Sequence, residues 1–153
     1  MTRTRLILIA AGGSAALLLG ALAFQYVGGL APCTLCIWQR WPHLAAVILG
    51  ALALGVRGPV LPLLGALATL ATAGIGGFHA GVEWGWWEGL ASCSAGSIAG
   101  ISTSDLLNPD VVVAAPVRCD AVAWALLGLS MAGWNAVISL GLAGIWLLAA
   151  REK

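Results

Sequence analysis

The sequence contains few charged residues. Lys and Arg together number 7 and Asp and Glu 6, so charged residues make up 8% of the chain, against about 25% in an average soluble domain. Hydrophobic residues make up 61%, and the mean hydropathy is +0.99. These values predict an integral membrane protein. The net charge of +1 and the lack of a basic cluster argue against nucleic-acid binding.

Several motifs of soluble enzymes are also missing. The sequence contains no Gly-rich phosphate-binding loop, no His-Glu-x-x-His motif and no Ser/His/Asp grouping, so hydrolase and kinase functions have no support. With only 2 histidines and 4 cysteines, no ligand set for haem or an iron-sulfur cluster is visible. The 21 glycines are scattered through apolar segments, where small residues commonly serve helix packing.

Long apolar segments are present instead. As helices, such segments reach across about 30 Å of hydrocarbon, which predicts one all-α membrane domain over residues 1–153. The second loop contains a candidate for a short interfacial helix near 104–107. The expected spans are 6–30, 37–56, 60–78 and 121–150, with outward loops at 31–36 and 79–120.

The first apolar segment supports two further statements. Gly12, Ala16 and Gly20 recur at every fourth residue, and we expect this ridge of small residues to pack against a neighbouring helix. The rival interpretation is a cleaved signal peptide, because Ala21-Leu22-Ala23 resembles a cleavage site. Apolar residues continue to Leu30, whereas the apolar region of a signal peptide is usually about 7–15 residues long, which favours a spanning helix.

The distribution of charge predicts the orientation. Positively charged residues flank the side of the membrane that carries both termini, and most acidic residues lie in the loops on the other side. The positive-inside rule therefore puts both termini in the cytoplasm. All four cysteines then face an oxidising compartment, where disulfides persist. The basic residues on the first side are Arg3, Arg5, Arg57, Arg151 and Lys153.

Cys33 and Cys36 form a Cys-x-x-Cys pair, and Arg40 follows at the edge of the second apolar segment. In a helix Cys36 and Arg40 are i, i+4 neighbours, with Cys33 one turn earlier on much the same face. A helix N-terminus and a guanidinium both favour a thiolate, which is the environment of a reactive cysteine. Without Arg40 the second segment is too short to span, so Arg40 is a candidate functional residue. The alternative is an interfacial arginine that snorkels to water.

The four cysteines allow three pairings and several kinds of site. A zinc site would need a second closely spaced ligand pair, but Cys93 and Cys119 lie far apart in the sequence, so we expect no metal. A static staple is conceivable for Cys93 and Cys119. It explains Cys33 and Cys36 poorly, because so short a loop restrains little and makes an exchangeable disulfide. Two exchangeable pairs favour a relay from a soluble thiol to a two-electron acceptor in the bilayer, and a quinone fits.

These residues also resemble a known family. The stretch from Cys33 to Arg40 is similar to the Cys-x-x-Cys-x-x-x-Arg of DsbB, the bacterial inner-membrane thiol:quinone oxidoreductases. The segments Phe78-His79-Ala-Gly-Val-Glu83-Trp84 and Cys119-Asp-Ala-Val-Ala-Trp124 resemble that family as well. The resemblance implies a four-helix bundle that binds ubiquinone or menaquinone and reoxidises a periplasmic DsbA-like thioredoxin-fold protein.

The resemblance also implies a role for each site residue. The partner's thiolate would attack Cys93, and the freed Cys119 would pass on to Cys33. Cys36 would then donate to the quinone, held by Arg40. His79 corresponds to a residue near the quinone, or is an interfacial histidine with no role.

The loop around Cys93 lacks the proline often found just before that cysteine in the family, so a DsbI-type homologue with a dedicated partner is an alternative. Two rivals from other classes stay open. They are a metal-binding or metal-transporting membrane protein, and a noncatalytic membrane protein stapled by disulfides.

Overall fold

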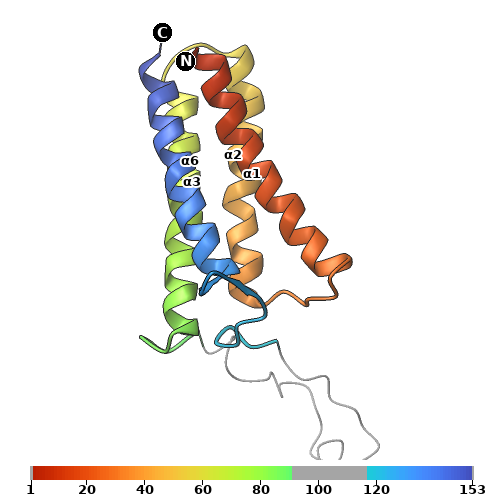
Figure 1. Cartoon of the computed structure of the whole chain (residues 1–153). Coiled ribbons are helices and arrows are strands. Elements are labelled where there is room, and N and C mark those ends of the chain that lie inside the picture. The colour runs from red at the N-terminus through yellow and green to blue at the C-terminus, as the bar shows by residue number, and fades with distance from the viewer. Residues whose placement is uncertain (1, 91–116, 153) are drawn as a thin grey trace, which may run out of the picture.

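In a computed structural model, which describes residues 2–90 and 117–152, the chain forms a bundle of helices (Figure 1). The all-α fold expected from the apolar segments is confirmed. A two-stranded antiparallel hairpin precedes the last helix, with Ala125 opposite Ser130 and Leu126 opposite Leu129. The elements are α1 (Arg3–Tyr26), α2 (Thr34–Gly55), α3 (Val60–Glu83), β1 (Ala125–Leu126), β2 (Leu129–Ser130) and α6 (Met131–Arg151).

Three of these helices, α1, α3 and α6, are long and apolar enough to cross a membrane. The fourth, α2, is of similar length but carries Gln39, Arg40 and His43 in its first half. Gln39 and His43 are buried, so α2 directs these polar side chains into the bundle rather than toward lipid. The helices together form an all-α membrane bundle.

The last helix begins later than the sequence predicts. Residues 121–130 were expected to belong to the span 121–150, but α6 starts at Met131. Leu127 and Gly128 have φ values of 53° and 80°, a left-handed conformation that ends any helix and forms the turn of the hairpin. Ser130 then caps α6 by accepting a hydrogen bond from the amide of Gly133 at 3.2 Å.

The other helix ends differ from the expected spans by smaller amounts. The first helix ends at Tyr26 rather than at 30, and Gly29 follows with a φ of 67°, as is common after a helix C-terminus. The third continues to Glu83 rather than stopping at 78. This extension matters because it carries His79 and Glu83 on the helix. The expected interfacial helix near 104–107 lies outside the described residues.

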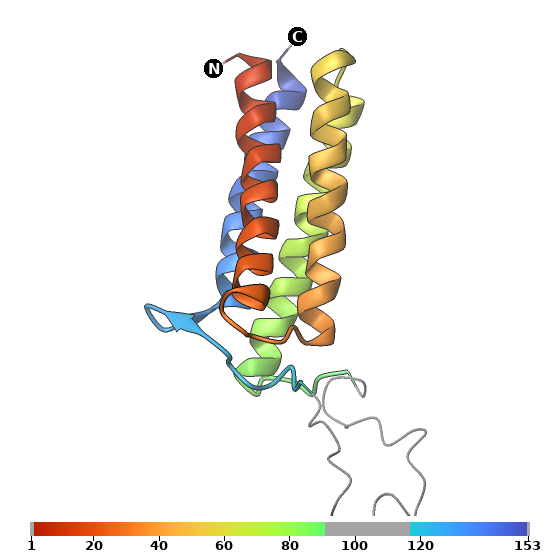
Figure 2. The same cartoon turned by 90° about the vertical axis from the view of Figure 1, so that its right-hand side faces the viewer.

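Both chain termini lie at the same end of the bundle (Figures 1 and 2). This end contains a core of Leu6, Ile7, Ala10, Ala53, Ala66, Trp146 and Ala149. Small residues allow close helix contacts there, since a Cβ on Gly50 would lie 2.4 Å from Cβ of Ala11 and one on Gly65 would lie 2.6 Å from the Trp146 ring. Toward its C-terminal end α1 diverges from α2 (Figure 1).

The ridge expected on the first helix does not pack as predicted. A Cβ added to Gly12 or Gly20 would meet nothing within 4 Å, and the buried face of α1 is formed by Leu6, Ile7, Ala10 and Ser14. The spacing of small residues is right for a contact surface, but the helix is rotated so that a different row of residues, which includes Ile7 and Ala10, faces the core. Gly13 instead meets Leu142 of α6.

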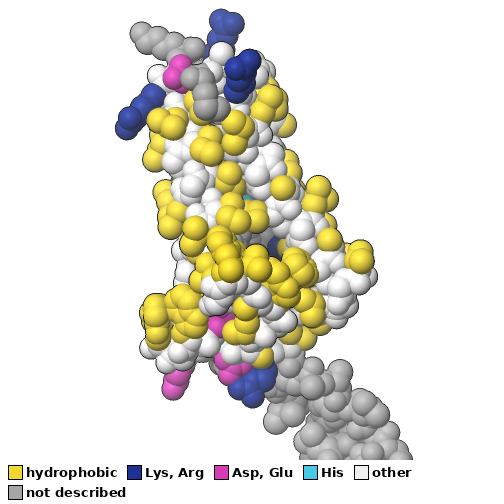
Figure 3. Space-filling view, viewed as in Figure 1, with side chains coloured by type: hydrophobic (Ala, Val, Ile, Leu, Met, Phe, Trp, Pro, Cys, Tyr) yellow, Lys and Arg dark blue, Asp and Glu magenta, His cyan; other side chains and the backbone are white. Residues whose placement is uncertain are grey.

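Charged side chains gather at the two ends of the molecule. On the face shown in Figure 3, most basic side chains lie at the end with the termini and apolar side chains cover the middle. Most acidic side chains lie at the opposite end, together with a basic group. Arg3 links α1 to the end of α2 by donating hydrogen bonds to the carbonyls of Ala53 at 2.9 Å and Val56 at 3.1 Å. Cys33, Cys36 and Cys119 lie at the end away from the termini.

Candidate active site

Cys33 and Cys36 lie at the N-terminus of α2. Cys33 is the N-cap residue, with extended backbone, and its sulfur accepts a hydrogen bond from the amide of Cys36 at 3.1 Å. Both cysteines are free thiols, so the disulfide expected between them in the resting protein is not formed in this structure. The arrangement is that of a reduced Cys-x-x-Cys pair whose second thiol sits in the first turn of a helix, where the dipole favours a thiolate.

The Cys33 thiol keeps its proton. It is 3% exposed, and its side-chain hydrogen bond with the Cys36 thiol, followed by its burial, raises the pKa of Cys33 well above its ordinary value. Cys36 is therefore the thiol of the pair that ionises. It is partly exposed and lines a cavity inside the bundle. The two thiols of the motif thus have different chemistry despite being three residues apart.

Cys119 approaches this pair from the segment before β1. It is fully buried and disulfide-bonded. Its neighbours Arg118 and Asp120 form an exposed ion pair, with Arg118 Nε donating to Asp120 Oδ1 at 2.8 Å, and the Arg118 guanidinium lowers the pKa of Asp120. Cys93, the fourth predicted cysteine of the site, lies outside the described residues.

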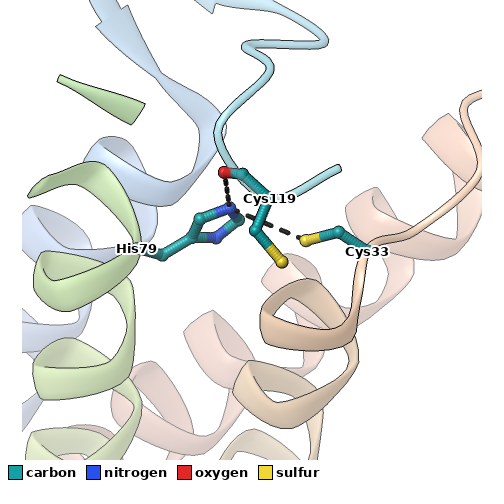
Figure 4. A group of neighbouring side chains, drawn as sticks. All are labelled: Cys33, His79 and Cys119. Atoms are coloured by element: carbon teal, nitrogen blue, oxygen red, sulfur yellow. Dashed lines mark hydrogen bonds between the residues drawn. The ribbon is translucent and has the colours of Figure 1, made fainter. Parts of the chain in front are cut away.

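Cys33, His79 and Cys119 come together although they belong to three different segments (Figure 4). The two sulfur atoms and a ring nitrogen of His79 all lie within 4.8 Å of one another, and all three residues are buried. His79 Nε2 is 3.6 Å from the Cys33 sulfur and 3.1 Å from the Cys119 carbonyl oxygen. The sulfur atoms of Cys33 and Cys119 are therefore close enough for thiol–disulfide exchange once one of them is a thiolate.

The hydrogen bonds around His79 determine which ring nitrogen carries its proton. The amide of Gln39 donates to the Leu35 carbonyl at 3.2 Å and lies 3.0 Å from His79 Nδ1. With the amide nitrogen as donor, Nδ1 accepts, and the proton of a neutral imidazole resides on Nε2. That N–H is directed at the carbonyl of Cys119 and the sulfur of Cys33. Glu83 Oε1 lies 3.9 Å from His79 Nε2 and belongs to the same polar group.

A cavity of about 360 Å³ extends from the cysteines into the bundle. Its wall is mostly apolar and is contributed by all four helices and the segment before α6. Polar side chains on that wall include Cys36, Arg40 and His79. At the mouth, Phe24 of α1 and Trp124 pack with ring centroids 5.3 Å apart. A largely apolar cavity with a few convergent polar groups is the usual form of a site for a small organic ligand.

Arg40 lies on the cavity wall rather than in water. It is partly buried, and its Nη1 donates to Gln25 Oε1 at 2.6 Å. Its Nε is buried without a hydrogen-bond partner among the described residues, so the guanidinium retains a donor for an electron-rich ligand. A quinone carbonyl matches this donor, and the apolar wall matches the ring and tail. The residues present therefore fit the cofactor class expected from the sequence.

The group of Cys33, His79 and Cys119 also has the composition of a metal site. Zinc binds cysteine as the thiolate, whereas the sulfur of Cys119 is held in a disulfide. In this redox state the group therefore offers Cys33 and His79 but not a third ligand. Thiol–disulfide exchange, in contrast, needs one thiol and one disulfide, which Cys33 and Cys119 provide in this redox state.

A comparison with protein families identifies the chain. The model of the family "Disulfide bond formation protein DsbB" matches residues 3–149. The chain belongs to the DsbB family. It is accordingly a membrane oxidoreductase of disulfide bond formation, and the resemblance noted in the sequence is confirmed.

Curated relatives support this membership along most of the chain. "Disulfide bond formation protein B" of Methylococcus capsulatus is 36% identical over 144 residues, covering 88% of this chain and 85% of the relative. The protein of the same name from Polaromonas naphthalenivorans is 33% identical over 159 residues, covering 97% and 94%. That from Albidiferax ferrireducens is 33% identical over 149 residues, covering 88% and 84%. No solved structure matches the chain.

Several polar residues of this DsbB-family site were not singled out from the sequence. Gln39, His43, Glu83 and Asn135 all line the cavity. A usable signal was present, because polar side chains inside apolar segments tend to face a bundle interior or a cavity. Glu83 also accepts a hydrogen bond from the hydroxyl of Ser130, which ties the end of α3 to the start of α6.

Proposed function

We propose that the protein is a thiol:quinone oxidoreductase that reoxidises a periplasmic DsbA-like thioredoxin-fold protein. The observation that carries this proposal is the Cys33 thiol within 4.8 Å of the disulfide-bonded sulfur of Cys119, beside a cavity that Cys36 and Arg40 line. One end of the site is thus suited to thiol–disulfide exchange between the two cysteine pairs. The other end opens into the bundle, where a lipid-soluble acceptor resides.

The proposed relay begins with the partner. In the oxidised protein Cys33 pairs with Cys36 and Cys93 with Cys119. A thiolate of the partner attacks Cys93, which breaks the bond to Cys119 and forms a mixed disulfide. Cys119 then attacks Cys33 and releases Cys36 as a thiolate, while the partner's second thiol resolves the mixed disulfide. The partner leaves oxidised.

The cycle closes at the cavity. A bound ubiquinone or menaquinone supplies the two-electron acceptor. Cys93 attacks Cys119, which re-forms their disulfide and releases Cys33 as a thiolate. Oxidation of Cys33 and Cys36 to their disulfide would then pass two electrons and two protons to that acceptor. Two electrons and two protons leave the partner dithiol and the same number reach the quinone. Arg40 would hold a quinone oxygen through its unpartnered Nε, and His79 would orient Cys33 and Cys119.

This function requires the cysteines to face the periplasm. We infer an inner-membrane protein with both termini in the cytoplasm, supported by the basic side chains at the terminal end of the bundle and the positive-inside rule. Labelling the reduced protein in intact cells with a membrane-impermeant thiol reagent tests this orientation. Modification of the cysteines only after the inner membrane is permeabilised would overturn it, because the soluble partner could not reach them.

The direct test of the activity uses the whole protein in detergent or lipid. Reduced DsbA-like protein and a soluble quinone analogue are added, and quinone reduction is followed together with oxidation of the partner. We expect one quinone reduced per partner disulfide formed. Partner oxidation without quinone reduction would show that the acceptor is wrong, and no partner oxidation at all would favour a noncatalytic stapled protein.

Metal binding is the second candidate, and it applies to the reduced protein, in which Cys119 would be a thiol; the single observation that favours it is that Cys33, His79 and Cys119 lie close enough to hold one ion. The two functions leave different traces. Elemental analysis of the purified protein would find a stoichiometric metal in the one case, whereas the relay needs none. Retention of turnover after treatment with a chelator would decide for the relay.

A further inference from the structure

Two residues that line the cavity each carry a buried polar atom with no hydrogen-bond partner among the described residues. These atoms are Nε of Arg40 and Nδ1 of His43. His43 is 3% exposed and lies one helical turn beyond Arg40 on α2, so that the two side chains share a face. A buried polar atom left without a partner is destabilising, and because both residues line the cavity, a bound ligand can supply the missing partners. The relay described above gives a role to Arg40 but none to His43.

The neighbouring hydrogen bonds show what kind of partner His43 lacks. The Thr72 hydroxyl donates its hydrogen to the Gln39 carbonyl at 3.0 Å. Thr72 Oγ1 can therefore only accept in its contact with Asn135 Nδ2 at 3.1 Å. The same Nδ2 donates to Gln39 Oε1 at 2.7 Å. The amide of Asn135 therefore has only one possible orientation, with its oxygen toward His43.

His43 must then be the donor in its own contact with Asn135. Its Nε2 lies 2.8 Å from Asn135 Oδ1, and an amide oxygen only accepts. In the neutral imidazole the proton is thus on Nε2, and Nδ1 presents a bare lone pair. That atom is an acceptor, and only a group with an O–H or N–H can satisfy it.

We propose that His43 Nδ1 accepts a hydrogen bond from a hydroxyl of the reduced quinone, so that this site binds quinol more tightly than quinone. The inference rests on the proposed function. An oxidised quinone presents carbonyl oxygens, which accept from Arg40 but have no proton to offer His43. A quinol presents hydroxyls, which do. His43 is therefore a specificity-determining residue for the redox state of the ligand.

This preference acts on the direction of electron transfer. Binding that is stronger for the product than for the substrate shifts the bound equilibrium toward the product. In this site it draws electrons from Cys36 to the ring. One hydrogen bond of ordinary net strength corresponds to about three- to tenfold in affinity, which is enough to bias the step while still allowing the product to leave.

The test compares the affinities of the two redox forms. All proteins carry Cys36→Ser, so that no electrons are exchanged, and are held in lipid nanodiscs. A short-chain ubiquinone and its quinol are titrated separately, with tryptophan fluorescence as the readout. We expect His43→Leu to weaken quinol binding about three- to tenfold and to leave quinone binding within about twofold. Ser139→Ala is the matched control, since Ser139 Oγ contacts His43 Nε2 at 3.5 Å from outside the cavity wall, and it should preserve the preference.

A second measurement needs no substitution at His43. In protein with ¹⁵N-labelled histidine, the Nδ1 resonance should have the position of a bare acceptor and should move when quinol is added but not when quinone is added. An equal loss of both affinities in His43→Leu, or an Nδ1 signal that ignores quinol, overturns the role of His43 alone. Failure of the protein with native His43 to bind either form overturns the proposed function together with this inference.

Discussion

The two ends of the bundle are built differently from the same four helices. At the end with the termini, Trp146 and small residues fill the interior, and Gly50 and Gly65 allow contacts that leave no room for another carbon. At the opposite end, the core of Cys33, Leu35, Val82 and Cys119 borders a cavity of about 360 Å³. Packing that stabilises the bundle is therefore separated from the space in which a ligand would bind.

The polar groups follow the same division. The buried network that joins His43, Asn135, Thr72, Gln39 and His79 runs beside the cavity, whereas the core at the other end is apolar. Such a network is costly to bury unless its members are satisfied. Its presence on one side of the bundle only indicates that it serves the site. Substitutions at one end should therefore change chemistry, and those at the other end should change stability.

The largest effect is expected from Cys33→Ser. Serine is a good N-cap residue, so its hydroxyl can take over the hydrogen bond from the Cys36 amide and the helix should be preserved. Loss of a nucleophile typically costs roughly a thousandfold or more in turnover. Quinone reduction with the reduced partner measures the loss, and thermal unfolding should be nearly unchanged. Thr34→Ala, between the two cysteines, is the control that should retain activity. Residual turnover near that of the native protein would remove Cys33 from the relay.

Arg40 should give the next largest effect. A charge-assisted hydrogen bond contributes about 1.5–3 kcal/mol, so Arg40→Ala should weaken quinone affinity or slow quinone reduction roughly ten- to a hundredfold. Lysine should restore part of this, because it returns the charge but not the planar fork. A visible charge-transfer band between the Cys36 thiolate and quinone, seen with Cys33 replaced, reports on the same contact.

The control for Arg40 is Gln25→Ala, which removes the residue that accepts from Nη1 without touching the guanidinium. Its effect should be smaller than that of Arg40→Ala. Identical affinity, turnover and band in the native, Arg40→Lys and Arg40→Ala proteins would mean that Arg40 is an interfacial residue that merely snorkels to water.

The sequence predicted the helices better than it predicted their ends and faces. Apolar runs indicate that a segment is buried in lipid or protein, but they do not separate a helix from a short hairpin, so the turn at Leu127 and Gly128 was missed. The ridge of Gly12, Ala16 and Gly20 was placed on the wrong face for a similar reason. Its spacing identifies small residues on one side of α1, whereas the rotation of α1 depends on how Ile7 and Ala10 fill the core.

The site divides in the same way. A local pattern was enough to group Cys33, Cys36 and Arg40, because spacings of three and four residues put them on one face of a helix. His79 and Cys119 came only from the resemblance to a family, because no local spacing relates them to Cys33. His43 and Asn135 were passed over, since a lone polar residue in an apolar segment does not show which partner it meets across the bundle.

Stability at the terminal end should depend on the smallest residues. Gly65→Ala would bring Cβ to 2.6 Å from the rigid ring of Trp146, which is fully buried, and overpacking of this kind typically costs about 1–3 kcal/mol. Gly74→Ala on the same helix meets nothing within 4 Å and should be neutral or slightly stabilising. Thermal unfolding in detergent measures both. Equal behaviour of the two variants would mean that the terminal end is not tightly packed.

The smallest effect is expected at Arg3, and it tests whether the two ends are independent. Arg3 donates to the carbonyls of Ala53, Val56 and Gly58 at 2.9, 3.1 and 3.2 Å, which include carbonyls left without helical partners at the end of α2. Because these contacts are partly exposed, Arg3→Ala should lower the free energy of unfolding by about 1 kcal/mol. Arg5→Ala is the matched control, since Arg5 is exposed and its replacement removes the same charge near the terminus. Turnover, measured at a temperature well below that of unfolding, should be unchanged in both variants, because the cavity lies at the opposite end. A loss of turnover in Arg3→Ala without a loss of stability would show that the two ends are coupled through α2.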